Sequence, residues 1–362
     1  MAKVLFENHH LYYLPNFIPV IEEMRKRGQY EIFASIPHMM DEEEKTTFVS
    51  ACDKLNINTI IEKSEELRLS KIKDNSFDVV IVGNVGQLNK IIDDREVSVM
   101  IYHGIGLKQS YYNDIDSRID LRSVESESRM LELVSHGHDN LVLTGYTKCD
   151  PLVTDNNDSI LANLDLDTDL KTILYAPSFY PTSLDKLIPI LPKLSCETNL
   201  IIKLHNFSWY QDRYKHQSEK MIELADNNKN IFLASHNDYN IIPYYSIADL
   251  LISDISSTMF EYLYLNRPII MAECFELRLK HKIFKQRFIK RMDLKRMEGI
   301  DFAMKVNDPE DLIALTYHGL EHPEDLESER LSAQKEYLFK VDGKASSRII
   351  DAIESKLSGA QN

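Results

Sequence analysis

Short apolar runs that alternate with longer amphipathic segments constrain the fold of this chain more than any other feature. The segments 77–82 (FDVVIV) and 97–102 (VSVMIY) are continuously apolar, as strands buried on both faces of a parallel sheet usually are. The alternation starts again at residue 172, after a stretch rich in Asp and Asn at 150–169. We therefore expect an α/β protein with two Rossmann-like halves, whose parallel sheets face a central cleft.

The expected elements follow from this pattern. In the first half, strands are predicted at 3–6, 31–35, 77–82, 97–102 and 141–143, with a helix at 17–27 closed by Gly28. In the second half, strands are predicted at 172–175, 199–204, 231–233, 250–253 and 268–271, with helices at 184–194 and 256–265.

The chain of 362 residues is long enough for two domains that each bury their own core. The Asp- and Asn-rich stretch reads as the linker, with a boundary near residue 155. The predicted organisation is a Rossmann-like domain at 1–154, a second one at 155–342, and a C-terminal helix and tail at 343–362.

Composition excludes several classes of protein. No apolar run is long enough to cross a membrane, and the N-terminal segment has no secretory pattern, so a cytoplasmic location is expected. The net charge of −15 gives no electrostatic reason to bind nucleic acid. The four cysteines lie far apart without metal-ligand spacing, and we expect neither a metal nor a cofactor.

One segment departs from this acidic average. Residues 278–296 (RLKHKIFKQRFIKRMDLKR) contain nine Lys or Arg and a single acid, Asp293. Most charge runs are solvated helix faces. Here apolar residues are interleaved at spacings that could form one helical face, so an anionic membrane surface is the alternative partner. The interleaved apolar residues are Ile283, Phe284, Phe288, Ile289 and Met292.

Polar residues follow the predicted strands, where ligands bind in doubly wound sheets. His103 comes directly after the strand at 97–102, with Gly104, Gly106 and Lys108 behind it. A histidine beside a lysine suits a general base next to an anionic substrate. A hydrogen-bonded turn histidine explains the same pattern equally well.

A second polar group follows the strand at 250–253. Asp254 precedes Ser256, Ser257 and Thr258 at the start of a predicted helix that carries Glu261. Such a start can bind phosphate through its N–H groups, whereas capping alone would explain a single serine. Asp254 by itself is weak support for a metal site.

Other strand ends carry weaker signals. His205 and Asn206 follow the strand at 199–204, and Ser178 follows the strand at 172–175. His9 and His10 follow the first strand and could reach the cleft. Each of these is more often structural when taken alone.

Several segments, in their order along the chain, resemble the CDP-glycerol glycerophosphotransferase family of teichoic-acid and capsule synthesis. The segment SIADLLISDISSTMFEYLYLNRPII at 246–270 resembles the family closely, and its residues 254–260 are the most specific part. The resemblance covers roughly residues 95–355. The weaker matches are YHGIGLK at 102–108, TGYTKCDPL at 144–152, ILYAPS at 173–178, KLH at 203–205 and VDGKASSRIIDAI at 341–353.

The resemblance implies a GT-B fold with an acceptor-side first domain and a nucleotide-donor second domain. It implies transfer of an alditol phosphate from a CDP-alditol to an acceptor hydroxyl, with release of CMP. The acceptor would be lipid-linked or polymeric, and the enzyme could then be peripheral at the inner face of the membrane.

The resemblance also assigns roles to residues. His103 would be the general base, and His205 would act with it in catalysis by neutralising the donor pyrophosphate. The donor phosphates would be bound by Ser256, Ser257, Thr258 and Lys108. The donor nucleotide or alditol would be held by Glu261, Asp254 and Ser178.

Some positions depart from the family pattern. Phe179 or Tyr180 stands where the family often has Arg, Asn206 replaces a proline, and Thr147 and Lys148 replace Pro-Arg. The alternatives are a nucleotide-sugar glycosyltransferase or epimerase of the same fold, and a non-catalytic nucleotide-binding protein. The histidines at 103 and 205 favour phosphotransfer.

Overall fold

The structure is a computed structural model, and it describes residues 1–86, 88–93, 95–107, 109–113, 116–154, 160–275, 277–284, 286, 289–290 and 292–359. The chain divides into two compact units. The first unit contains Met1–Gly104, Tyr112–Val153 and the segment that starts at Glu336. The second unit contains Ile105–Tyr111 and Thr154–Lys335. The predicted division differs, because it assigned 336–342 to the second domain and treated 343–362 as a separate tail.

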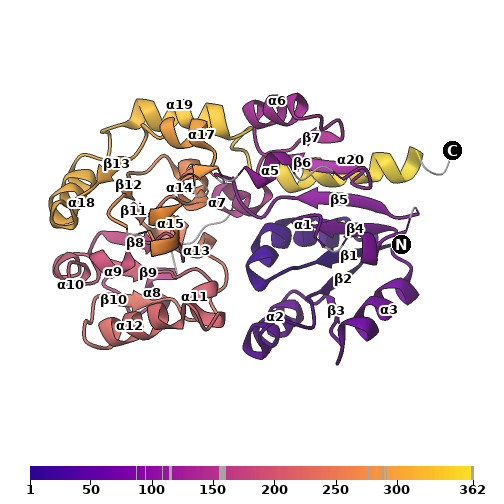
Figure 1. The fold of residues 1–362 in the computed structure, drawn as a ribbon, viewed down its shortest axis with the longest axis horizontal. Helices are drawn as coiled ribbons and strands as arrows, with labels where there is room; N and C mark the ends of the chain where they lie inside the picture. The colour runs from indigo at the N-terminus through magenta and orange to yellow at the C-terminus, as the bar shows by residue number, and fades with distance from the viewer. Residues whose placement is uncertain are drawn as a thin grey trace. The chain divides into compact units, whose positions relative to one another are not determined.

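The first unit is a seven-stranded sheet in the order β3-β2-β1-β4-β5-β6-β7, and every neighbouring pair is parallel (Figure 1). Its strands are β1 (Ala2–Glu7), β2 (Tyr30–Ser35), β3 (Asn58–Ile60), β4 (Val79–Val82), β5 (Val97–Ile101), β6 (Leu121–Val124) and β7 (Leu141–Leu143). Its helices are η1 (Leu11–Tyr13), α1 (Leu14–Arg27), α2 (Glu42–Lys54), α3 (Glu65–Asn75), α4 (Leu88–Ile91), α6 (Glu127–Ser135), η2 (Thr147–Cys149) and α20 (Ala345–Gly359). Two short helices, α5 (Ser110–Asn113) and α7 (Pro151–Thr154), lie where the chain passes between the units.

The second unit is a six-stranded parallel sheet in the order β10-β9-β8-β11-β12-β13. Its strands are β8 (Thr172–Ala176), β9 (Asn199–Ile202), β10 (Ile231–Leu233), β11 (Leu250–Ser253), β12 (Ile269–Ala272) and β13 (Met304–Val306). Its helices are α8 (Ile160–Asn163), α9 (Leu184–Leu187), α10 (Leu191–Leu194), α11 (Phe207–Tyr210), α12 (Lys215–Asp226), α13 (Ile242–Ile247), α14 (Ser257–Tyr262), η3 (Leu263–Leu265), α15 (Leu279–Ile283), α17 (Leu294–Glu298), η4 (Pro309–Asp311), α18 (Leu312–Glu321) and α19 (Glu327–Tyr337).

The predicted class is confirmed, because the apolar runs form the central strands of both sheets. Every residue of β4, β5, β8 and β11 is buried, as expected for strands covered on both faces. Gly28 closes α1 with φ of 70°, a left-handed conformation that glycine adopts without strain. The predicted helix at 184–194 is wrong in detail, since two single-turn helices, α9 and α10, occupy this stretch.

Some elements have no clear apolar pattern and were not predicted. Strand β6 has the sequence LRSV, and its Arg122 is fully buried against Met100 and Tyr102. The guanidinium of Arg122 lies over the Tyr102 ring at 5.6 Å, so a charged residue fills a core position by pairing inside the sheet. Alternation of apolar and polar residues cannot reveal such a strand.

The C-terminal helix α20 is part of the first unit, where it packs on α1, β5 and β6. Its N-terminus is capped by a residue almost two hundred positions earlier. Both carboxylate oxygens of Asp150 accept backbone hydrogen bonds, from Ala345 at 3.0 Å and from Ser346 at 2.8 Å. Arg348 in the first turn donates to the carbonyl oxygen of Thr144 at 2.9 Å. Two of the family-like motifs are therefore joined to each other in this unit.

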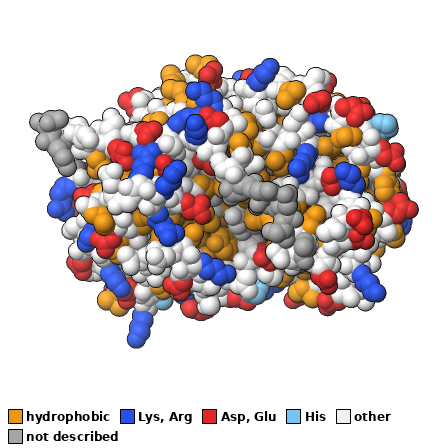
Figure 2. Space-filling view, turned by 180° about the vertical axis from the view of Figure 1, so that it is seen from behind, with side chains coloured by type: hydrophobic (Ala, Val, Ile, Leu, Met, Phe, Trp, Pro, Cys, Tyr) orange, Lys and Arg blue, Asp and Glu red, His pale blue; other side chains and the backbone are white. Residues whose placement is uncertain are grey.

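Acidic and basic side chains are interspersed on the face drawn in Figure 2. Among the described helices, none is both long and apolar enough to span a bilayer. The basic segment 278–296 is not one continuous helix, because α15 ends at Ile283 and α17 begins only at Leu294. Arg296 is also buried and pairs with Asp293, so it does not belong to a solvated basic face. Phe288 lies outside the described residues.

Candidate active site

His103 lies just after β5, at the carboxyl edge of the first sheet. Its Nδ1 is 3.1 Å from the carbonyl oxygen of Gly83, which follows β4. A carbonyl oxygen can only accept a hydrogen bond, so Nδ1 carries the proton in the neutral ring. Nε2 is then the basic nitrogen, as a general base requires.

Aromatic rings fix the orientation of His103. The centroid of Tyr13 is 4.4 Å from the imidazole, and Tyr12 meets the imidazole edge-on at 5.7 Å. A Cβ placed on Gly83 would lie 2.1 Å from the Tyr13 ring, so only glycine allows this approach. The sequence reasoning missed Tyr12, Tyr13 and Gly83, because nothing in their local pattern connects them to residue 103.

Two further histidines follow β1. Burial, and next the charge of His10, lower the pKa of His9 to about 4, so His9 is neutral near pH 7. The Nδ1 of His10 is 3.2 Å from a carboxylate oxygen of the buried Glu44, which also accepts from the backbone N–H of Leu11. Both histidines follow β1, and the expectation that they could reach the cleft stays a prediction.

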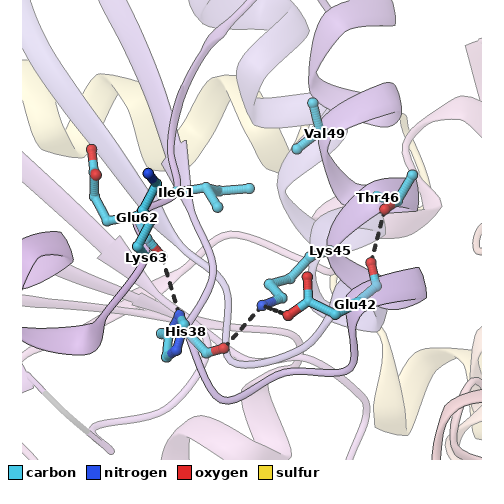
Figure 3. A pocket seen from close by; sticks show the side chains of 8 residues that line it. All are labelled: His38, Glu42, Lys45, Thr46, Val49, Ile61, Glu62 and Lys63. Atoms are coloured by element: carbon cyan, nitrogen blue, oxygen red, sulfur yellow. Dashed lines mark hydrogen bonds and ion pairs between the residues drawn. The ribbon is translucent and has the colours of Figure 1, made fainter.

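A cavity of about 600 Å³ opens near the carboxyl ends of β2 and β3 (Figure 3). Lys45 lies at its wall, where it donates to the carbonyl oxygen of His38 and pairs with Glu42. The ring of His38 contacts the carbonyl oxygen of Glu62 at 3.1 Å. The lining of this cavity carries both positive and negative side chains, and none of its residues belongs to the cluster around His103.

In the second unit, Asp254 organises the loop after β8. It is fully buried, and it accepts hydrogen bonds from the backbone N–H groups of Ser178 at 2.8 Å and Ser183 at 3.2 Å. The Ser183 hydroxyl also donates to it. Burial raises the pKa of Asp254 to about 6. Because its oxygens are used inside the protein, Asp254 positions the loop at 178–183, and we do not assign it direct contact with a donor.

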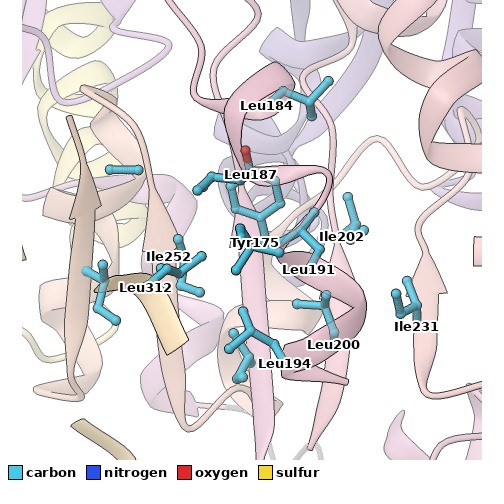
Figure 4. Close-up of a cluster of buried hydrophobic side chains, with 14 of the residues drawn as sticks. Tyr175, Leu184, Leu187, Leu191, Leu194, Leu200, Ile202, Ile231, Ile252 and Leu312 are labelled. Carbon is cyan, nitrogen blue, oxygen red and sulfur yellow. The ribbon is translucent and has the colours of Figure 1, made fainter. Parts of the chain in front are cut away.

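This loop is anchored to the apolar core of the unit. Tyr175 belongs to that core, and its hydroxyl is 2.9 Å from the hydroxyl of Ser183 (Figure 4). Ser178 donates its own hydroxyl hydrogen to the carbonyl oxygen of Pro181. Ser178 is therefore also held by the loop, and it was the residue expected to contact the nucleotide or alditol.

The helix start after β11 contains the three predicted hydroxyl residues. Ser256 is the N-cap of α14, since its Oγ accepts from the N–H of Thr258 at 3.3 Å. The Thr258 hydroxyl is 2.7 Å from Ser253 Oγ, which itself donates to the carbonyl oxygen of Ala176. Capping and strand anchoring thus account for Ser256 and Thr258, while Ser257 is the first residue of the helix.

Glu261 is buried on the second turn of α14, 1% exposed. Tyr245 on α13 donates to Glu261 Oε2 at 3.1 Å. This hydrogen bond holds one carboxylate oxygen of Glu261 in place. The role expected for Glu261, holding hydroxyl groups of the donor, stays a prediction.

His205 follows β9 and is only partly buried. Its Nδ1 accepts a hydrogen bond from the backbone N–H of Phe207 at 3.1 Å, so the neutral ring carries its proton on Nε2. The rings of Phe179 and Phe207 flank it at 4.7 and 4.9 Å. The Nε2–H of His205 can therefore donate a hydrogen bond to an anion, whereas His103 carries its proton on Nδ1.

Neighbouring residues complete this edge of the second sheet. Asn206 is 5% exposed, and its Nδ2 has no hydrogen-bond partner among the described residues. Lys203 is buried and donates to the carbonyl oxygen of Leu204 at 3.0 Å. Lys108, which was expected near the donor phosphates, lies outside the described residues. Within the described ranges, no three His, Cys, Asp or Glu side chains are grouped closely enough to hold a metal ion.

Two doubly wound units, each with a histidine at the carboxyl edge of its parallel sheet, define a protein of the GT-B fold. The sequence model of the CDP-glycerol:poly(glycerophosphate) glycerophosphotransferase family matches residues 121–355. The chain belongs to this family. The predicted family is therefore confirmed, and so is the predicted reaction class, transfer of an alditol phosphate such as glycerol phosphate from a CDP-activated donor to an acceptor hydroxyl. No curated protein sequence matches the chain significantly.

Solved structures support the fold. A variant of the wall teichoic acid polymerase TagF, soaked with CDPG, aligns over 100% of this chain and 89% of its own, with a TM-score of 0.74 and 18% identity. An epimerase structure from Listeria monocytogenes, described as a putative UDP-N-acetylglucosamine 2-epimerase, covers 98% of this chain and 96% of its own, with a TM-score of 0.64 and 15% identity. MnaA from S. aureus in a UDP co-structure covers 99% and 97%, with a TM-score of 0.62 and 14% identity. At these identities the likeness establishes the fold alone.

Proposed function

We propose that this enzyme transfers glycerol phosphate from CDP-glycerol to a hydroxyl group of a poly(glycerophosphate) chain. His103 Nε2 takes the proton of the acceptor hydroxyl, and the acceptor oxygen forms a bond to the glycerol-bearing phosphorus of the donor. The bond from that phosphorus to the bridging oxygen breaks, and CMP leaves with the electron pair. The observation that carries the proposal is the bond between His103 Nδ1 and Gly83, which leaves Nε2 as the basic nitrogen.

The second unit would bind the donor. His205 Nε2–H and the helix start at Ser256 and Ser257 would donate hydrogen bonds to the diphosphate oxygens, which lowers the cost of the charge that develops on the leaving CMP. Glu261 would accept hydrogen bonds from the hydroxyl groups of ribose or glycerol. Asp254 and Ser178 would position this site through the loop at 178–183.

The donor is the best supported part of the proposal. The family name specifies CDP-glycerol, and the TagF structure that aligns over the whole chain was soaked with CDPG. A lipid-linked poly(glycerophosphate) acceptor of wall teichoic acid type fits the same comparisons. UDP-sugar chemistry is the second candidate, since the Listeria epimerase structure and the MnaA–UDP co-structure share the fold at similar coverage.

A donor panel separates the two functions. The wild-type protein is incubated with a poly(glycerophosphate) acceptor and with CDP-glycerol, CDP-ribitol or UDP-N-acetylglucosamine in turn. We expect acceptor-dependent release of CMP with CDP-glycerol, and His103→Ala should lower its rate by about 10²- to 10⁴-fold without changing donor affinity. The control is His322→Ala, at an exposed position after α18. Epimerisation of the UDP-sugar, with no release of CMP from either CDP-alditol, would overturn the proposal.

We also propose that the enzyme works at an anionic membrane surface. Leu279, Ile283, Phe284 and Leu294 are large apolar side chains that lie exposed within the basic segment 278–296. Exposed apolar side chains among lysines are what an interfacial segment needs. A lipid-linked acceptor would give the enzyme a reason to dock there.

A further inference from the structure

The second unit contains a cavity of about 520 Å³ that the proposed mechanism does not use. It lies between the loop after β8, the start of α12, and the residues just before α15. Its wall combines cations with aromatic rings. The residues used below are Phe179, Tyr180, Lys186, Arg213, Tyr214 and Arg278.

Arg278 is held in place by two of these rings. Its guanidinium carbon lies 4.0 Å from the centroid of Tyr180 and 5.2 Å from that of Tyr214. The backbone N–H of Arg278 donates to the Tyr180 hydroxyl at 3.1 Å, and this hydroxyl is 2.7 Å from His281 Nδ1. A guanidinium fixed between aromatic faces loses little conformational entropy when it binds an anion.

The charge of the cavity is opposite to that of the chain. Lys186, Arg213 and Arg278 bring three permanent positive charges to a protein of net charge −15. Among the described residues of the lining, the acidic one is Asp185, which pairs with Lys220 at 2.7 Å. In the part of the chain that the structure describes, neither Arg213 nor Arg278 forms an ion pair. Two arginines that form no ion pair with the described residues, beside a lysine at the same cavity, favour an anionic ligand.

The cavity lies beside the predicted donor site. Phe179 lines it, and the same ring is 4.7 Å from the ring of His205 and 5.1 Å from that of Tyr214. Gln217 Nε2 donates to the carbonyl oxygen of Phe179 at 3.0 Å, which holds this shared wall in place. A ligand group in the cavity would therefore be a near neighbour of the diphosphate that His205 is proposed to bind.

We propose that this cavity binds a phosphodiester group of the poly(glycerophosphate) acceptor, one that is not itself reacting. A volume of about 520 Å³ is far larger than a phosphate ion needs and accommodates a whole glycerol phosphate unit. The inference rests on the proposed function, because it takes the acceptor from it. It adds a reason for the enzyme to prefer a charged polyol chain over a single neutral hydroxyl compound.

The test uses the full-length chain with Lys186 and Arg213 both changed to Glu, because both are exposed and neither is needed for the core. The control carries Lys229→Glu and Lys335→Glu, which make the same change in net charge at exposed positions away from the cavity. Calorimetry measures binding of synthetic oligo(glycerol phosphate) to each protein. We expect the cavity variant to bind about 10- to 100-fold more weakly, and the control to bind like wild type. Added salt should weaken wild-type binding more than that of the variant.

Two further measurements make the outcome specific. Calorimetry with CDP-glycerol should show equal donor affinity in wild type and the cavity variant, and a loss of donor affinity would mean that the cavity is part of the donor site. Binding to phosphatidylglycerol vesicles should also be equal, and a loss confined to vesicles would assign the cavity to lipid headgroups. Equal binding of the oligomer by wild type and the cavity variant would overturn the inference. These experiments measure binding without turnover, so they test the cavity even if the enzyme does not catalyse the proposed reaction.

Arg278→Lys keeps the charge and removes the planar guanidinium that stacks between Tyr180 and Tyr214. We expect it to weaken oligomer binding, but by less than Arg278→Gln. Equal affinities for Arg278→Lys and wild type would show that only charge matters at this position.

Discussion

A partly buried histidine, His9, is uncharged near neutral pH and lies near the proposed base. His9 contacts Tyr13, the same ring that packs on His103. Its pKa is lowered to about 4, chiefly by burial, and the ordinary value is 6.5. Between these values the unfolded chain binds a proton that the folded chain does not, so stability contributed by neutral His9 is present above pH 6.5 and is lost as the pH falls toward 4.

We expect His9→Gln to reduce the pH dependence of stability. Between about pH 7 and pH 5, protonation of His9 in the unfolded chain should account for up to roughly 2 kcal/mol of the wild-type loss in the free energy of unfolding. Urea unfolding of both proteins at the two pH values measures the difference. Parallel losses in wild type and variant would mean that His9 does not contribute.

At the same scale, the sequence predicts the strand-end residues but not their partners. His103 and His205 were found because chain order alone places them after strands. The hydrogen bond to Gly83 sets which nitrogen of His103 is protonated, and the hydrogen bond from Phe207 does the same for His205. Asp254 positions its loop through the hydrogen bond from Ser183. The contacts of His103 and Asp254 join positions far apart in sequence, and a local pattern of residue types carries no information about them.

At the scale of elements, the serines at the start of α14 can be tested for a structural role against a role in binding the donor. Ser256 caps the helix, and Ser257 is its first residue. Replacing both with Ala should weaken CDP-glycerol binding, because hydroxyl groups that could face the diphosphate are lost. Donor titration by calorimetry, alongside thermal unfolding, measures both effects. If only stability falls, by about 1 kcal/mol for the lost cap, the two serines are structural.

Helix α20 depends on a cap that comes from outside its own sequence. Asp150 accepts from two backbone N–H groups at its start, and the carboxylate is almost fully buried. We expect Asp150→Ala to lower the free energy of unfolding by roughly 2 kcal/mol, because both N–H groups lose their partner in a buried place. Urea unfolding measures this loss. The comparison is Asp342→Ala, a partly exposed acid just before the same helix, where the effect should be smaller.

The motif TGYTKCDPL at 144–152 was recognised from its resemblance to the family, and the predicted helices and strands gave no role for it. Tyr146 and Thr147 both donate side-chain hydrogen bonds to Asn16 on α1, while Asp150 holds α20. The motif therefore ties two helices of the first unit together. The sequence shows that these residues occur as a set, and only the structure shows that they join residue 16 to residue 345.

For the whole molecule, the proposed membrane docking requires a local attraction that exceeds the repulsion from the net charge of −15. Screening over about 8 Å at physiological salt limits that repulsion to nearby groups. Changing the exposed residues Lys280, Lys282, Lys290 and Lys295 to Glu should abolish co-sedimentation with phosphatidylglycerol vesicles at low salt. Wild type should sediment with these vesicles and not with phosphatidylcholine vesicles. Equal sedimentation of both proteins would leave 278–296 as a solvated segment.

The chain leaves the first unit at Val153 and returns to it at Glu336, with most of the second unit between. During synthesis, β1 to β7 therefore emerge long before α20, which covers part of the same sheet. The second unit can complete its core while the first still lacks the helix that Asp150 caps. A nascent chain halted before residue 336 should then contain a protease-resistant second unit and a protease-sensitive first unit. The first part of the protein to be made would be the last to become stable.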